Sequence, residues 1–493
     1  MQKGILIILD GYGEGKDYPY NAVKNANTPF LDKLHQMSHS LLKTDGEAVG
    51  QFKNELGGSE VGHTTIGAGK ITPSTAKKIH DDIKSGEFKN NLLLLKQLTT
   101  LKKRGGNLHL VGMMSDKNIH SDIHHAYEII KIAKSYAKNI FLHLITDGRD
   151  TPPKDSLKYL REVQNFIKPI KNCEIASIGG RLYAMDREGN LDRTILAYNA
   201  MFNPKTKIKQ TELNKYLSTQ HKLGNTDQYI IPTGVETSVN TTITKNDTIF
   251  IFNFREDRLR QLAREMQELP AKLITMSRVE GAKSIVLYPV KPIKNTMIEH
   301  LSKLGLSQLK ISETTKYAHV TYYLNGGREE PFPGEERVHV KTRKVENFAT
   351  TPKMRAGEIA TEAVKAIEKG YDAIYINFSN PDMVGHTGDY EATVTSLEFL
   401  DKCVKKVVDN AIKNNYVLLI TADHGNSEEM RTENGEPHMA HTLNRVFCVA
   451  VSKNTYKMAR FGGLQDIAPT FEYLLGVKKN PHYTGKNLIL NKN

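Results

Sequence analysis

The sequence predicts an α/β fold in two domains, one inserted into the other, and three observations lead to that prediction. Short apolar runs alternate with helix-length amphipathic segments along almost the whole chain, which is typical of mainly parallel sheets covered by helices. The chain has 493 residues, which is more than one average domain holds. Metal-type residues gather in residues 1 to about 75 and about 370 to 445, whereas arginine-rich motifs lie between them. We therefore expect a metal-binding domain that is interrupted by a second domain.

The expected elements follow from the apolar patterning. Helical spacing is found at residues 123–137, 156–167 and 357–369. The short apolar runs expected to form strands are residues 5–9, 108–112, 140–145, 174–178, 248–252, 284–287, 373–378, 416–420 and 447–451. Prolines near residues 71–74 and 288–292 indicate extended connections, so we expect the chain to cross between domains there. This gives a discontinuous domain of residues 1–75 and 291–493 and an inserted domain of residues 76–290.

Composition excludes several classes of protein. Apolar runs last only about five to seven residues, against the ~18 or more that a membrane-spanning helix needs, and Asp10 ends the first run too early for a signal-peptide core. The three cysteines are far apart and odd in number, which favours a reducing cytoplasm. The net charge is +13, but the lysines are scattered as on solvated helix faces. We expect a cytoplasmic protein that binds neither membranes nor nucleic acid.

Three strands are expected to end in carboxylates. The apolar run 5–9 stops at Asp10, and the run 416–420 leads to Asp423 and His424. The run 373–378 leads to Asp382, with His386 four residues on. One aspartate after a strand often only caps the next helix, but three such endings indicate a metal centre at one sheet edge. Mixed oxygen and imidazole donors suit Mn²⁺ or Zn²⁺, and six candidate ligands are too many for one open site, so two metals are expected. The candidates are Asp10, Asp382, His386, Asp423, His424 and His441.

Ser59 is the candidate nucleophile. It follows Gly57 and Gly58 at the expected start of a helix, where glycines allow close approach and the helix end favours an anion. A serine hydroxyl needs a base or a metal to ionise it at neutral pH. The alternative for this motif alone is a serine that only caps the helix.

Five arginines lie at expected strand ends or in glycine turns. Arginine binds phosphate and carboxylate through paired hydrogen bonds, so the set fits a substrate that carries both groups. Each one alone could instead form a surface salt bridge. A nucleic-acid groove is less favoured because these segments lack aromatic residues for stacking. The five are Arg149, Arg181, Arg187, Arg255 and Arg258.

Taken together, these motifs make the chain similar to the cofactor-independent phosphoglycerate mutases of the alkaline phosphatase superfamily. The resemblance runs over nearly the whole length. One departure lies in Ser115-Asp116-Lys117-Asn118-Ile119, because the family usually has Gly-Gly-Val before the histidine. The matching segments are Leu9-Asp10-Gly11-Tyr12-Gly13, residues 57–63, 146–153, 180–187, 253–258, 316–321, 380–388 and 421–426, and His441-Thr442.

The resemblance implies an alkaline-phosphatase-like three-layer α/β/α domain with an inserted α/β phosphotransferase domain. It implies two Mn²⁺ ions (with Co²⁺ or Zn²⁺ as alternatives) and no 2,3-bisphosphoglycerate. One ion would be held by Asp10, Ser59, Asp423 and His424, and the other by Asp382, His386 and His441. A monomer is the family expectation.

The resemblance also implies an activity, the interconversion of 3-phosphoglycerate and 2-phosphoglycerate in glycolysis and gluconeogenesis. Ser59 would carry the phosphoryl group as phosphoserine, Asp150 would handle hydroxyl protons and Lys316 would neutralise charge at the phosphoryl group. The substrate would be held by His120, Arg149, Asp150, Arg181, Arg187, Arg255, Arg258 and Lys316. The alternatives are a metal-dependent phosphatase or another phosphomutase of the same superfamily, and a nucleic-acid-binding protein that uses the net charge.

Overall fold

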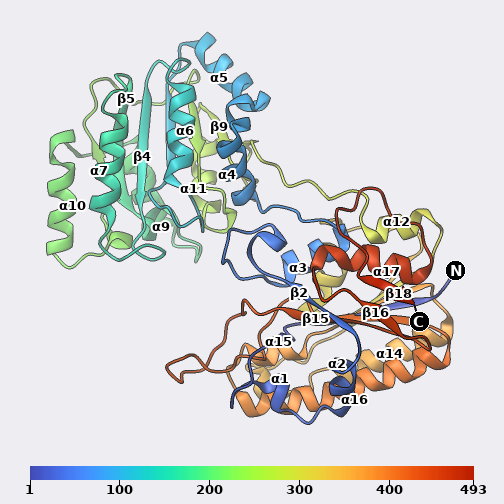
Figure 1. Ribbon diagram of the computed structural model, residues 1–493. Coiled ribbons are helices and arrows are strands. Elements are labelled where there is room, and N and C mark those ends of the chain that lie inside the picture. The colour runs from blue at the N-terminus through green and yellow to red at the C-terminus, as the bar shows by residue number, and fades with distance from the viewer. Residues whose placement is uncertain (493) are drawn as a thin grey trace. The chain divides into compact units, whose positions relative to one another are not determined.

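The computed structural model describes residues 1–492, and the chain forms two compact units. The first consists of Met1–Ser74 and Lys291–Asn493, and the second of Thr75–Val290. Each unit is built on its own eight-stranded sheet (Figure 1). Among the described residues, no helix combines the length and the apolar character that a membrane crossing needs.

The sheet of the first unit is mainly parallel. Strands β14, β15 and β2 pair antiparallel, and the other neighbours are parallel. In spatial order the strands are β12 (Glu335–Val340), β11 (Gln308–Glu313), β13 (Ala373–Phe378), β1 (Gly4–Leu9), β14 (Val417–Thr421), β15 (Val446–Val451), β2 (His39–Lys43) and β17 (Phe461–Gly463). A small separate sheet pairs β16 (Tyr456–Met458) with β18 (Ile489–Lys492).

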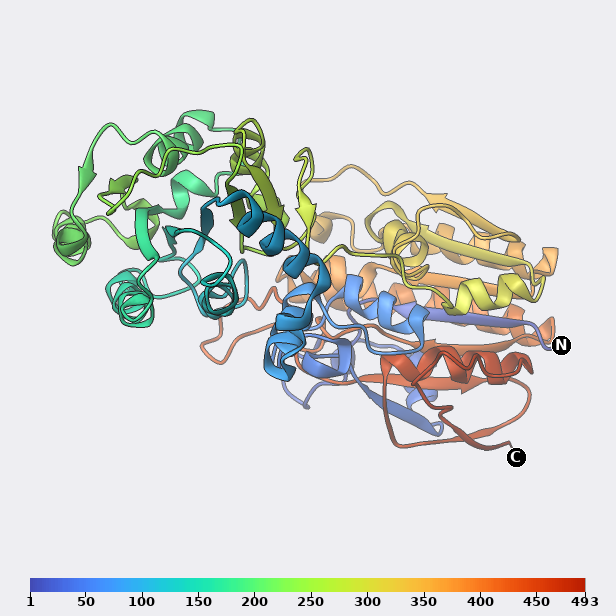
Figure 2. The same cartoon turned by 90° about the horizontal axis from the view of Figure 1, so that it is seen from above.

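Helices cover both faces of this sheet, which gives three layers (Figures 1 and 2). One face carries α1 (Ala22–Asn25), α2 (Pro29–His35), α14 (Ala356–Lys369), α15 (Asn380–Gly385) and α16 (Tyr390–Lys413). The other face carries α3 (Ser59–Ala68), α12 (Met297–Lys303) and α17 (Ile467–Leu475). Further short helices are α13 (Thr314–Ala318) and η6 (His319–Tyr323). Burial on both faces explains why the central strands are almost purely apolar in sequence.

The three strands with expected carboxylate endings are neighbours in the centre of this sheet. Every residue of β13, β1 and β14 is buried. Leu9 of β1 pairs in parallel register with Phe378 of β13, and Ile8 with Thr421 of β14. Their carboxyl ends therefore meet at one edge of the sheet, which positions the residues that follow them.

The second unit has the same layered design. Its sheet runs in the order β10 (Ile285–Val286), β9 (Lys272–Thr275), β8 (Thr248–Ile251), β3 (Leu108–Met113), β4 (Ile140–Thr146), β5 (Cys173–Gly180), β7 (Thr233–Val235) and β6 (Lys207–Ile208). All neighbours are parallel except β5 and β7.

Two separate apolar cores line the two faces of that sheet, because side chains alternate along its strands. One core contains Leu110 of β3 and side chains from α4 (Thr75–Ser85), α5 (Leu92–Arg104), α6 (Ile123–Ala133), α7 (Ser156–Ile167) and α10 (Leu213–Lys222). The other contains Val111 of β3 and side chains from α8 (Arg181–Ala184), α9 (Leu191–Phe202) and α11 (Arg260–Gln267). The predicted α/β class with layered helices is thus confirmed in both units.

Several expected element ends differ from the structure, and two of the differences are informative. The helix expected over residues 123–137 ends at Ala133, because the side chain of Asn172 donates to the carbonyl oxygens of Lys134 and Ala137 at 3.1 and 3.2 Å and the chain turns there. The strand expected over residues 284–287 shrinks to Ile285–Val286 at the sheet edge. The helix expected over residues 156–167 is confirmed at both ends.

Candidate active site at the sheet edge

Three buried aspartates converge where the central strands end. Asp10 follows β1, Asp423 follows β14, and Asp382 lies in the first turn of α15 after β13. His424 lies between them, with its Nε2 atom 3.4 Å from Asp10 Oδ1, 3.7 Å from Asp423 Oδ2 and 4.0 Å from Asp382 Oδ1. The structure therefore brings together residues that are more than 400 positions apart in the sequence.

Gly11 allows this close approach. Its φ is +76°, and an added Cβ would lie 2.6 Å from the Cα of Asp382. A side chain at this position would be strained by the left-handed backbone and would also push two of the carboxylates apart. The glycine after Asp10 is thus a requirement of the site.

Two histidines complete a second group around Asp382. His386 Nε2 is 3.1 Å and His441 Nε2 is 3.3 Å from Asp382 Oδ1, and the two nitrogens are 3.1 Å apart. His441 is fixed by its Nδ1 atom, which is 2.8 Å from the carbonyl oxygen of Gly57. His386 is similarly fixed through the carbonyl oxygen of Met439 at 2.6 Å. Convergent imidazole nitrogens whose far side is anchored to a carbonyl are typical of metal ligands.

Ser59 is the first residue of α3, and its hydroxyl contacts Asp10 and His424 of the first group. Its Oγ is 2.9 Å from His424 Nε2, 3.2 Å from Asp10 Oδ1 and 2.6 Å from Lys316 Nζ. The residue before it, Gly58, occupies the cap position, and Ser59 makes no capping bond. The alternative of a serine that serves only as a helix cap is therefore wrong.

Lys316 is the one lysine or arginine that the structure shows in contact with this group among the described residues. Its Nζ is 2.7 Å from Asp10 Oδ1 and 2.6 Å from Asp382 Oδ2. Burial acts to raise the pKa of Asp10, but Lys316 and His424 hold that pKa well below its ordinary value. For His424, burial acts to lower the pKa, but Asp423 and the other carboxylates raise it to about 10. Three buried carboxylates thus still exceed the positive charges of Lys316 and protonated His424, and buried charge needs compensation.

Because the buried negative charge is in excess, the donor set fits a divalent metal ion. In each of three groups, the donor atoms lie within 4.8 Å of one another. The buried Oδ2 atom of Asp423 has no hydrogen-bond partner among the described residues. Carboxylate and imidazole together suit Mn²⁺, Co²⁺ or Zn²⁺ better than Mg²⁺ or Ca²⁺. The three groups are Asp10, Asp382 and His424; Asp382, His386 and His441; and Asp10, His63 and Asp423.

Two supporting residues were missed by the sequence analysis. His63 Nδ1 lies 3.2 Å from Asp423 Oδ2 and 2.9 Å from the carbonyl oxygen of Ser59. Asn377 donates through Nδ2 to Asp10 Oδ2 at 2.8 Å and lies 3.1 Å from His63 Nε2. The position of His63, one helical turn after Ser59, was a readable signal. Asn377 gave none beyond being a polar residue inside an apolar strand.

The candidate substrate residues of the second unit also converge. Arg181 is buried and its Nη1 is 2.5 Å from Asp147 Oδ1 and 2.6 Å from Asp150 Oδ2. His120 Nε2 is 3.8 Å from the same Asp150 oxygen. Burial, followed by the charge of Arg181, lowers the pKa of His120 to about 4, so the ring is neutral at physiological pH.

The remaining arginines surround this group. Burial, together with the positive charges of Arg187, Arg181 and Arg149, lowers the pKa of Arg258. Arg255 and Arg187 both contact Asp257, at 3.0 and 3.7 Å. The positive charges of these arginines repel one another. Such a cluster of like charges is a feature of anion-binding sites.

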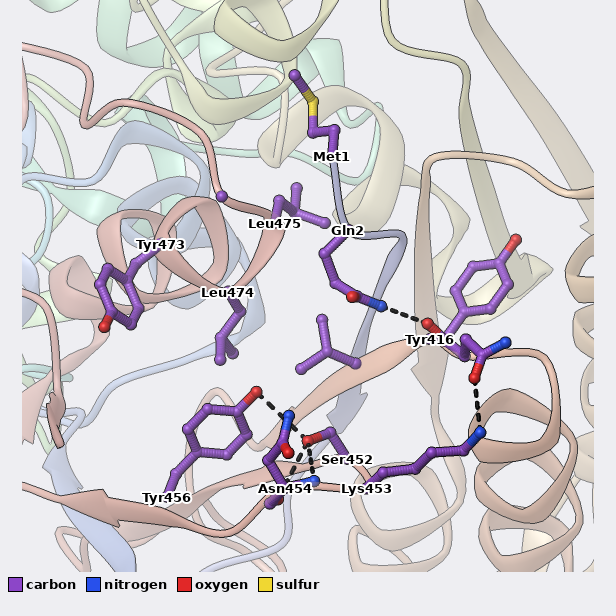
Figure 3. A pocket seen from close by; sticks show the side chains of 13 residues that line it. Met1, Gln2, Tyr416, Ser452, Lys453, Asn454, Tyr456, Tyr473, Leu474 and Leu475 are labelled. Atoms are coloured by element: carbon purple, nitrogen blue, oxygen red, sulfur yellow. Dashed lines mark hydrogen bonds between the residues drawn. The ribbon is translucent and has the colours of Figure 1, made fainter. Parts of the chain in front are cut away.

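A surface pocket of the first unit lies at the amino ends of β1 and β14 (Figure 3). It is lined by Gln2, Tyr416, Lys453 and Leu475 among others, and Lys453 Nζ bonds Asn415 Oδ1 at 2.6 Å. The described residues place no group of metal-type donors in this pocket. The chemistry of the unit is therefore expected at the other edge, where the parallel strands end.

Comparison with known proteins agrees with this geometry. A family model described as the metalloenzyme superfamily matches residues 2–479. The 2,3-bisphosphoglycerate-independent phosphoglycerate mutase 2 of Methanosarcina acetivorans is 38% identical over 99% of this chain and 97% of its own. The corresponding enzyme of Coxiella burnetii is 39% identical over 98% of this chain and 97% of its own. The chain belongs to the family of 2,3-bisphosphoglycerate-independent phosphoglycerate mutases.

A solved relative supports the fold of this mutase family. A crystal structure of Leishmania mexicana phosphoglycerate mutase at low cobalt concentration aligns with a TM-score of 0.64 and 30% identity. The alignment covers 99% of this chain and 97% of that one. The present chain matches a metalloenzyme superfamily and has groups of donor atoms at the sheet edge. It therefore depends on divalent metal.

The structure explains how the chain departs from the mutase family pattern before His120. The residues directly before it are Lys117, Asn118 and Ile119, where the family usually has Gly-Gly-Val. Asn118 takes a φ of +57°, a left-handed conformation that asparagine adopts more readily than other residues with a Cβ. Asn118 thus takes a backbone conformation that glycine also adopts freely.

Proposed function

We propose that this protein interconverts 3-phosphoglycerate and 2-phosphoglycerate through a phosphoserine at Ser59, without 2,3-bisphosphoglycerate. The observation that carries the proposal is the environment of the Ser59 hydroxyl, which contacts Lys316, Asp10 and His424 at the edge where the parallel strands end. Similarity to the mutases named above over nearly the full length of both chains supports the same activity.

Two metal ions would bind at this edge, and Mn²⁺ is the proposed metal, with Co²⁺ and Zn²⁺ as alternatives. Their chemistry would be to lower the pKa of an oxygen nucleophile and to neutralise phosphoryl charge. One ion would be held by Asp10, Ser59, Asp423 and His424, and the other by Asp382, His386 and His441.

In the first proposed step, Ser59 Oγ loses its proton and attacks phosphorus, the bond between phosphorus and O3 breaks, and O3 takes up a proton. Lys316 lies 2.6 Å from Ser59 Oγ, so its ammonium group is placed to stabilise negative charge that develops on the transferring phosphoryl group. Its ion pairs with Asp10 and Asp382 fix the side chain in that position before the reaction.

In the second proposed step, the 2-hydroxyl of the same glycerate attacks the phosphoserine, loses its proton, and releases Ser59 Oγ. Asp150 is proposed to exchange these hydroxyl protons. Its Oδ2 atom accepts a hydrogen bond from Arg181 at 2.6 Å and lies 3.8 Å from Nε2 of the neutral His120 ring. A mutase must keep the glycerate bound between the steps, whereas a phosphatase releases it.

The arginines are proposed to provide that retention. His120, Arg149, Arg181, Arg187, Arg255 and Arg258 would bind the carboxylate and phosphate of the substrate. On this view the first unit is the phosphatase-like, metal-binding domain and the second is the substrate-binding phosphotransferase domain. We further propose that the protein is a cytoplasmic monomer whose partners are small phosphoglycerates, with no nucleic acid and no membrane among them.

A coupled assay tests the proposal. Protein stripped with EDTA and reloaded with Mn²⁺ is given 3-phosphoglycerate, and 2-phosphoglycerate is measured with and without added 2,3-bisphosphoglycerate. The proposal predicts turnover that needs the metal and is unchanged by the bisphosphate. Release of free phosphate and glycerate would instead establish a phosphatase.

A further inference from the structure

A fourth group of metal-type side chains lies in the second unit, apart from every residue assigned above. His80 of α4 and Asp122 and His125 at the start of α6 each offer a donor atom, and these atoms all lie within 4.8 Å of one another. The two helices lie side by side on one face of the sheet (Figure 1). The cluster therefore joins two helices that are about 40 residues apart in the sequence.

His125 is the residue that most needs a partner. Its side chain is 1% exposed, and neither ring nitrogen has a hydrogen-bond partner among the described residues. A buried polar group without a partner is costly, so such groups in folded proteins generally mark a bound water, an ion or a functional role. Its ring packs against Phe254, with centroids 5.8 Å apart, which fixes its orientation.

Asp122 is oriented by its own neighbours. It caps α6, and its Oδ1 atom accepts from the backbone NH of His124 at 2.9 Å and lies 2.8 Å from His124 Nδ1. Both of these bonds end on the same oxygen. A carboxylate held on one oxygen by a histidine outside the cluster is a common arrangement at metal sites, where the second oxygen binds the ion.

The charge state of the cluster also fits a cation. The carboxylate of Asp122 places negative charge beside the buried ring of His125. The groups that face it are the carboxylate of Asp122 and the rings of His80 and His124. His80 is half-buried, so the cluster has access to solvent on that side.

We propose that His80, Asp122 and His125 form a third metal site that takes Zn²⁺ or a divalent ion of similar preference. Two imidazoles and one carboxylate are a common set of three protein ligands for zinc, with water in the fourth position. Mg²⁺ and Ca²⁺ favour all-oxygen sites and are excluded by the two nitrogen donors. The ion ties α4 to the start of α6, two residues after His120. This site is additional to the proposed function and does not depend on it.

Counting bound zinc tests the proposal. The full chain and its variants are stripped with EDTA, equilibrated in a zinc-buffered solution, and analysed for zinc per chain. Asp122→Asn keeps a capping side chain and His80→Asn changes a half-buried residue, so both variants are expected to fold. Each is expected to bind one ion fewer than the unaltered protein, as is His125→Asn. The matched control, Lys131→Gln, changes an exposed side chain of α6 that lies outside the cluster and is expected to bind the full number.

The difference in zinc per chain between the unaltered protein and the variants tests the third site, however many ions the sheet-edge centre binds. His441→Ala is expected to lower the count at that centre, and adding Asp122→Asn to it is expected to remove one more ion. Reloading with Co²⁺ gives a second measurement, since the variants are expected to lose part of the visible absorption of a four-coordinate site. Equal zinc counts in the unaltered protein, Asp122→Asn and His80→Asn would overturn the proposal. The cluster would then be a polar contact between helices.

Discussion

At the scale of single residues, the site depends on a balance of charge around the Ser59 hydroxyl. Asp10, Asp382 and Asp423 are fully or almost fully buried, and Lys316 contacts two of them. These aspartates could be found from the sequence because each follows an apolar run. His63 could be noticed from its position one helical turn after Ser59. Its contact with Asp423 and the role of Asn377 could not be predicted, because those partners come from segments that only the fold brings near.

Lys316→Met is expected to lower kcat about 10²-fold or more, because it removes the cation nearest the nucleophile while keeping the length of the side chain. Steady-state kinetics with Mn²⁺ at saturation measures this. Lys353→Met, which changes an exposed lysine stacked on Phe399 in the same unit, is the control and is expected to leave kcat unchanged. A Lys316→Met enzyme with kcat near that of the unaltered protein would contradict the role of this lysine.

Arg255→Ala is expected to reduce kcat/KM about 10²-fold with little change in stability. The side chain is half exposed and pairs with Asp257, and an exposed pair of this kind contributes at most about 1 kcal/mol to folding. Arg260→Ala is a matched control, since Arg260 is similarly exposed and pairs with Glu280 at 3.0 Å. Kinetics and urea unfolding of both variants separate the two effects. Equal kcat/KM in the two variants would remove Arg255 from the substrate site.

At the scale of elements, apolar periodicity predicted the interiors of strands and helices well and their ends less well. The helix from Ser156 to Ile167 was predicted at both ends, whereas α6 stops at Ala133 because Asn172, from a later segment, binds the carbonyl oxygens that follow. Edge strand β10 is short for a related reason, since an edge position has only one neighbour to pair with. Element ends depend on contacts from distant segments, which periodicity does not contain.

The turn before His120 gives a prediction at this scale. Asn118→Ala is expected to destabilise the protein by about 1–2 kcal/mol, because alanine in a left-handed conformation is strained. Asn118→Gly is expected to be neutral or stabilising, since glycine adopts that conformation freely. Urea unfolding midpoints measure both variants. If alanine and glycine have the same effect, the left-handed turn is not what residue 118 supplies.

At the scale of the whole molecule, the division into two units was predicted from the separation of metal-type and arginine-rich motifs in the sequence. The crossing points at residues 74–75 and 290–291 lie where prolines indicated extended connections. The second unit also contains buried histidines that the sequence analysis did not use. His109 Nδ1 and His143 Nε2 are 3.0 Å apart inside the sheet, and both side chains are fully buried.

These histidines predict acid sensitivity. Burial lowers the pKa of His109 to about 4 and that of His143 well below its ordinary value. Below about pH 6.5 the unfolded chain therefore binds protons that the folded chain does not, so stability falls as pH drops from about 6.5 toward 4. For His109 the loss is about 2 kcal/mol at pH 5, from about 1.4 kcal/mol per pKa unit.

Urea unfolding between pH 7 and pH 5 measures this effect. His109→Leu is expected to show a shallower loss of stability on acidification than the unaltered protein. His124→Gln changes an exposed histidine whose pKa is raised by its bond to Asp122, so it is not expected to flatten the profile. A pH profile that is the same with and without His109 would show that this histidine is not the group that titrates.

The claim central to this account is that Ser59 itself carries the phosphoryl group. The most direct measurement is to mix the Mn²⁺-loaded protein with 3-phosphoglycerate labelled at phosphorus, quench in acid, digest, and locate the label by mass spectrometry. We expect label on the peptide that contains Ser59, as acid-stable phosphoserine, and no label on the same peptide of Ser59→Ala. Turnover without label on Ser59, or label on a histidine instead, would contradict it.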